Sequence, residues 1–89
     1  MDAAELDRIA ATLEAAIAEA RVLAAADLAI RPDVREVIRY AREMHDLLVE
    51  ALVLNERLRT AQYRGIADST GNAVDELEAM VARADGKLN

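Results

Sequence analysis

Apolar residues crowd the middle of the chain, where only Glu50 interrupts the run from Leu47 to Leu54. Seven apolar residues in eight helical positions point in every direction rather than along one stripe. A helix of this kind needs cover on more than one side. We therefore predict a long helix over 34–63 that is central to a bundle or shared between two chains.

An amphipathic helix is predicted to precede it. Asp2 and Glu5 have the spacing of a capping box, so this helix should begin near Ala3 and weaken after Ala26. Its apolar positions recur at the 3-4-3 spacing of a heptad seam, which is typical of coiled-coil-like packing. The seam comprises Leu6, Ile9, Leu13, Ala16, Ala20 and Leu23, with Ile17 and Val22 widening the face.

The only proline of the chain marks the next boundary. Pro32 disfavours helical geometry in the residue before it and suits the first position of a helix, which predicts a connection over 27–32. Leu28 and Ile30 lie in this connection, and we expect them to fold back over the end of the bundle.

Glycines and capping residues punctuate the last third of the chain. Gly65 has the position of a C-terminal glycine stop for the long helix, and Ala67–Asn72 is rich in capping residues. A third helix should therefore begin between Asp68 and Asn72 and end at Gly86. Its apolar positions are Val74, Leu77, Met80, Val81 and Ala84.

Composition limits how such a bundle can be stabilised. The 89 residues form one domain (1–89) with no Cys, Phe or Trp, so 11 Leu, 5 Ile and 7 Val must supply most of the core. A chain this short buries a small share of its surface, and oligomerisation is a common remedy. We predict an all-α fold: a three-helix antiparallel bundle with a long central second helix, completed by homodimerisation.

The dimer or partner interface is placed on the second helix. Two narrow seams on its neighbours would leave Leu47, Val49, Val53 and Leu54 uncovered. Asn55 lies on the apolar seam of the same helix. It either fixes the register of a dimer as a buried polar residue or lies where the helix end is already solvated.

The distribution of charge predicts which helix lies between the other two, and the net charge disfavours some classes of partner. The net charge of −6 disfavours nucleic acid and anionic membranes as partners. Segment 31–65 has seven bases and six acids, whereas the flanking segments are acidic, which favours a second helix packed between the other two. No apolar run reaches the roughly 18 residues of a membrane span, so we expect a cytoplasmic protein. The Ala and Arg content is compatible with a bacterial or phage source.

Candidate chemistry is sparse. One side of the second helix carries a row of arginines that could bind an anion: Arg31, Arg35, Arg39 and Arg42. Small three-helix chorismate mutases have about this length and use helix arginines to hold a dicarboxylate, and this chain resembles them in architecture alone. A solvated, salt-bridged arginine face is the alternative that we favour. His45 lacks the spaced partners of a metal site, so no metal, cofactor or catalytic residue is assigned.

These observations favour a non-enzymatic helical module for protein–protein interaction: a small adaptor, chaperone or inhibitor. Its expected partners are a second copy of itself and an unidentified protein. Two alternatives remain. One is a small helical enzyme with an arginine-lined site, and the other is an acidic nucleic-acid mimic whose Asp and Glu cluster on one face of the outer helices.

Overall fold

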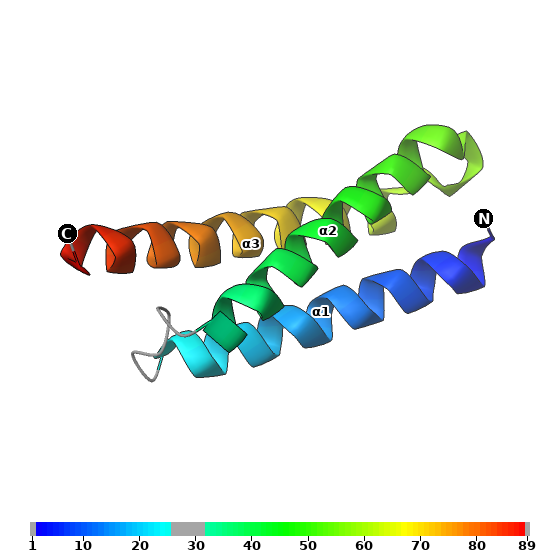
Figure 1. Ribbon diagram of the computed structural model, residues 1–89. Helices are drawn as coiled ribbons and strands as arrows, with labels where there is room; N and C mark the ends of the chain where they lie inside the picture. The colour runs from blue at the N-terminus through cyan, green and yellow to red at the C-terminus, as the bar shows by residue number, and fades with distance from the viewer. Residues whose placement is uncertain (1, 26–31, 89) are drawn as a thin grey trace.

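Three helices make up the computed structural model, which describes residues 2–25 and 32–88. They are α1 (Ala3–Ala25), α2 (Pro32–Leu54) and α3 (Ala61–Leu88), with a short 3₁₀ helix, η1 (Glu56–Leu58), between the last two. Figure 1 shows that α1 and α3 run in the same direction and α2 runs opposite to both. No strand occurs in the described ranges, so the predicted all-α class and three-helix count are confirmed. One chain does not test homodimerisation, which stays a prediction.

The local signals of α1 are confirmed. A side-chain oxygen of Asp2 accepts a hydrogen bond from the backbone N–H of Glu5 at 2.9 Å, as a helix N-cap does. The predicted heptad seam is buried or half-buried along its whole length. Val22 was expected to widen that face, and this is wrong. Its side chain is 72% exposed, because it lies on the side of α1 that faces away from both other helices.

The boundary between α2 and α3 differs from the prediction. The second helix ends at Leu54 rather than near Gly65, so it has 23 residues and is shorter than the 28-residue α3. Gly65 is an interior residue of α3, not a helix stop. The predicted loop Ala67–Asn72 is also helical, and the third helix begins at Ala61.

Side chains from the short connection end α2. The guanidinium of Arg59 donates to the carbonyl of Leu52 at 2.6 Å and also to that of Val53, and the amide of Asn55 donates to the carbonyl of Ala51 at 2.9 Å. The carbonyl of Ala51 also accepts the backbone N–H of Asn55 at 3.1 Å, whereas those of Leu52 and Val53 lie past the last helical N–H and depend on Arg59. A glycine is therefore not needed to end this helix.

The core fills the space between the three helices. Its most deeply buried side chains are Leu6, Leu13, Val34, Leu48, Val74 and Leu77. From the apolar run of α2, Leu48 is fully buried and Leu52 is 7% exposed. Tyr63 also enters the core, and its hydroxyl donates to Asp7 of α1 at 2.5 Å, which raises the pKa of Tyr63. Leu28 and Ile30 lie outside the described residues.

The burial of Leu48 generates the first prediction. Leu48→Ala should lower the free energy of unfolding by about 2–5 kcal/mol, because it leaves a cavity among packed aliphatic side chains. Val22→Ala is the matched control and should change stability by less than about 0.5 kcal/mol. Urea denaturation followed by circular dichroism measures both. Equal effects of the two variants would contradict the assignment of the core.

The glycines of α3 generate the second. A Cβ at Gly65 would meet no atom within 4 Å, so Gly65→Ala should stabilise the protein by about 0.4–1 kcal/mol, as expected for an interior helical position. At Gly71 the same Cβ would lie 2.9 Å from Nε2 of His45, so Gly71→Ala should lower the melting temperature. A destabilised Gly65→Ala would indicate the helix stop that the sequence suggested.

Candidate functional site

Three of the predicted anion-site arginines meet in a groove between α2 and α3. Arg35, Arg39 and Arg42 line one wall, and the groove has a volume of about 330 Å³. Its other lining residues are Ile38 of α2 and Glu78, Val81, Ala82 and Asp85 of α3. Arg31 lies outside the described residues.

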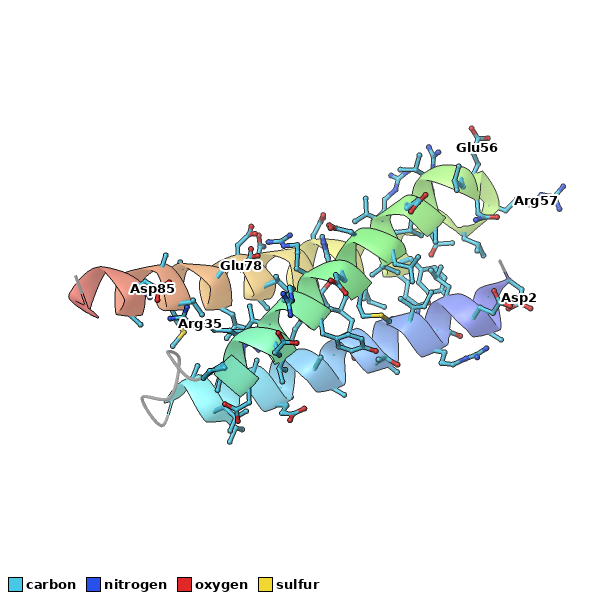
Figure 2. The ribbon with its side chains drawn as sticks, viewed as in Figure 1. Asp2, Arg35, Glu56, Arg57, Glu78 and Asp85 are labelled. Atoms are coloured by element: carbon cyan, nitrogen blue, oxygen red, sulfur yellow. The ribbon has the colours of Figure 1, made fainter. Side chains whose placement is uncertain are left out.

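Each of these arginines already has a carboxylate partner. Nη2 of Arg42 lies 2.5 Å from a carboxylate oxygen of Asp75 and 2.5 Å from one of Glu78. The hydrogen bond to Glu78 is the largest cause of a raised pKa of Arg42, and the bond to Asp75 is the second. Arg35 pairs with Asp85, as Figure 2 shows, and Arg39 pairs with Glu36. An external anion would have to displace one of these acids. The geometry therefore weighs against an anion site and favours a salt-bridged face, although the Nε of Arg35 is buried without a hydrogen-bond partner in the described chain.

His45 packs between α2 and α3 over Gly71. Its Nε2–H donates to the backbone carbonyl of Ala67 at 2.9 Å, whereas Nδ1 is buried and has no partner among the described residues. Within those residues, no group of three His, Asp or Glu side chains is placed to hold a metal ion. We interpret His45 as a residue that closes the α2–α3 contact over Gly71, where a side chain on α3 would collide with its ring.

The apolar residues assigned to an interface are exposed, but they do not form one patch. Leu47, Val49, Val53 and Leu54 are 41%, 39%, 59% and 72% exposed. Because a helix turns about 100° per residue, Leu47 and Val49 lie about 200° apart around α2. Val49 lines a hollow with Ala67 and other residues of α3, so it belongs to the α3 side of α2. The single patch expected from the sequence is therefore divided between two sides of the helix.

One of these sides carries a second heptad seam. We call it the outer seam, and it consists of Val37, Tyr40, Met44, Leu47 and Leu54. Val37 and Met44 are half-buried, whereas Tyr40, Leu47 and Leu54 are exposed and recur every seven residues. Seven residues fall about 20° short of two full turns, so these three side chains share one side of α2. Tyr40 was missed because the run of apolar residues begins only at Leu47.

A groove beside the outer seam separates α1 from α2. It has a volume of about 470 Å³ and is lined by Thr12, Ala15, Ala16, Glu19, Glu36, Val37 and Tyr40. Small side chains of α1 form one wall, and Glu19 and Glu36 place an acid on each helix. The sequence alone gave no sign of this groove, because Thr12 and Ala15 lie outside the seam expected for α1.

Asn55 lies at the end of α2 rather than within it. Its side chain is half-buried and donates to the carbonyl of Ala51 in the same helix. This position matches the interpretation of a residue at a helix end, and the contact is a capping bond within one chain. A role of Asn55 in setting the register of a dimer is not tested by a single chain.

No family of proteins, curated protein or solved structure matches this chain. Among the described residues, no helix combines the length and the hydropathy that crossing a membrane requires. The outer seam and the two grooves are therefore the features from which a function can be inferred.

The paired arginines generate a ligand-binding prediction. Millimolar phosphate or a small dicarboxylate should leave the melting temperature unchanged, because Arg35, Arg39 and Arg42 are already neutralised. The double variant Arg35→Ala with Arg39→Ala should lose less than about 1 kcal/mol of stability, since both side chains are substantially exposed. Differential scanning fluorimetry measures both effects. A ligand-dependent rise that disappears in Arg42→Gln would instead support the enzyme alternative.

Proposed function

We propose that the chain is a non-enzymatic protein–protein interaction module that forms a homodimer through the outer seam of α2. One observation carries this proposal: Tyr40, Leu47 and Leu54 remain 46%, 41% and 72% exposed at seven-residue spacing along one side of the helix. Scattered apolar residues are normal on a protein surface, but a row at heptad spacing is the pattern that pairs with another helix.

The size of the seam sets the expected strength of the dimer. Full burial of a large apolar side chain contributes about 1.5–3 kcal/mol, and a symmetric dimer would bury three from each chain. Tyr40 and Leu47 are already half covered, so the lower figure is used, which gives a gross gain of about 9 kcal/mol for the six side chains. Association costs at least about 4 kcal/mol, so the net gain is at most about 5 kcal/mol, which corresponds to a dissociation constant of about 0.2 mM or weaker. The dimer should therefore depend on concentration.

The alternatives draw less support from the same surfaces. An arginine-lined enzyme needs guanidinium groups free to meet a substrate, and those of Arg35, Arg39 and Arg42 are paired. An acidic nucleic-acid mimic needs free carboxylates on one face, and Asp75 and Glu78 of α3 are bound by Arg42. Neither alternative has an exposed feature that repeats along a helix as Tyr40, Leu47 and Leu54 do.

Sedimentation equilibrium tests the proposal. As the concentration rises into the low millimolar range, the weight-average mass of the wild-type protein should rise from the 9.7 kDa of one chain toward twice that mass. Leu47→Glu places a charge at the centre of the seam and should give the mass of one chain, with helical content unchanged by circular dichroism. Val22→Glu introduces the same charge at an exposed site of α1 and should leave the dimer intact.

Two results would overturn the proposal. One is a well-folded wild-type monomer across the whole concentration range. The other is a dimer that Leu47→Glu and Val22→Glu weaken equally, because the seam would then have no special part in the association.

A further inference from the structure

We propose that the two copies pair antiparallel about a two-fold axis at Leu47, so that the end of α2 in each copy fills the α1–α2 groove of the other. This arrangement rests on the proposed homodimer and adds its orientation, its register and a receiving site. The inserted end presents Leu54 and Arg57, and the receiving groove is the one lined by Glu19 and Glu36.

The spacing of the outer seam is symmetric about Leu47. Tyr40 and Leu54 each lie seven residues away, which is about 10.5 Å along the helix in opposite directions. A two-fold axis at Leu47 therefore places Tyr40 of one copy beside Leu54 of the second copy, twice. The large aromatic ring meets the most exposed leucine of the seam, and Leu47 packs against itself.

The groove has room for the side chains that this register delivers. Tyr40 and Val37 form part of its lining, so the Leu54 that arrives beside Tyr40 also arrives at the groove. Thr12, Ala15 and Ala16 keep the α1 wall low, and the 470 Å³ volume exceeds that of two leucine side chains. Leu54 is 72% exposed and supplies the insertion, whereas Leu58, which lines a second hollow with it, packs against the core of its own chain.

The charges of the two surfaces are complementary. Glu19 lines the groove, and Glu36 beside it is already paired with Arg39, whereas the inserted end carries Arg57. Figure 2 shows Arg57 pointing away from the end of α2, and no hydrogen bond or ion pair within the described chain holds its guanidinium. Arg57 follows Leu54 by three residues, and Glu19 lies on the α1 wall of the groove that receives Leu54, so the two charges come to the same end of the contact.

A parallel pair is disfavoured by the same residues. It would place Tyr40 beside Tyr40 and Leu54 beside Leu54, because equal positions meet in a parallel two-fold pair. The groove between α1 and α2 would then have no occupant, and Arg57 would lie far from Glu19 of the second copy.

Single-cysteine cross-linking distinguishes these arrangements, because the natural chain has no cysteine. Under mild oxidation, Leu47→Cys should form a disulfide-linked dimer with itself. Tyr40→Cys alone and Leu54→Cys alone should remain largely uncrosslinked, whereas an equimolar mixture of the two should give the mixed disulfide, identified by its mass. A disulfide requires Cα atoms about 4.4–6.8 Å apart, so only residues in direct register react efficiently.

Each other result has a distinct meaning. Efficient self-linking of Tyr40→Cys would establish a parallel pair and overturn this arrangement while leaving the homodimer. A dimer in sedimentation that none of these cysteines can cross-link would place the interface elsewhere and overturn both. A wild-type monomer would remove the proposed function and this arrangement with it.

Charge exchange tests the groove separately. Arg57→Glu and Glu19→Arg should each raise the dimer dissociation constant about 3- to 10-fold, and their combination should restore it to within about 3-fold of the wild type. Arg83→Glu carries the same charge change at an exposed position of α3 and is the matched control. The groove would lose its assigned occupant if the combination failed to restore binding or if the control weakened it equally.

Discussion

The end of α2 at Leu54 decides the shape of the rest of the molecule. Its last carbonyls are bound by Arg59 and Asn55, so the helix can stop without leaving unsatisfied backbone groups. The chain then reverses within a few residues and begins α3 at Ala61, early enough for Tyr63 to reach the core and bond to Asp7 of α1. A helix continued to Gly65 would have projected beyond α1 and left Tyr63 without that contact.

Electrostatics then fixes how α3 lies against α2. Arg35 and Arg42 of α2 face α3, where Asp85 pairs with Arg35 and both Asp75 and Glu78 pair with Arg42. These pairs are partly exposed, so each contributes little to stability, but their spacing opposes a rotation of one helix against the other. The same pairing consumes the groups that could have bound a small anion. Packing of α3 and an anion site on α2 therefore compete for the same arginines.

The parts of the fold that the sequence predicts are those set by local patterns. The heptad seam of α1 and its Asp2 cap need no information from elsewhere in the chain. The α2–α3 boundary was misplaced because Glu56, Arg57, Leu58 and Arg59 are all good helix formers, and only capping and packing in the folded chain make them a turn.

The capping residues further along were misleading for a related reason. Thr70 donates to the carbonyl of Ile66 within α3, so its hydroxyl is satisfied inside a helix rather than at its start. Gly71 is a glycine because the ring of His45 occupies the space of a side chain. Both contacts involve residues outside the segment 67–72, so the sequence of that segment does not predict them. The pairing of the arginines with α3 joins residues that are distant in the sequence, and it could not be predicted for the same reason.

Shortening α2 changes where its excess apolar surface lies. Part of it, at Val49, falls beside α3, and the rest forms the outer seam beside the groove of α1. A bundle that placed larger side chains at Thr12, Ala15 and Ala16 would fill that groove from within the chain and cover Tyr40. The small residues leave it open instead, next to the exposed apolar row of α2, and the proposed antiparallel dimer depends on this combination.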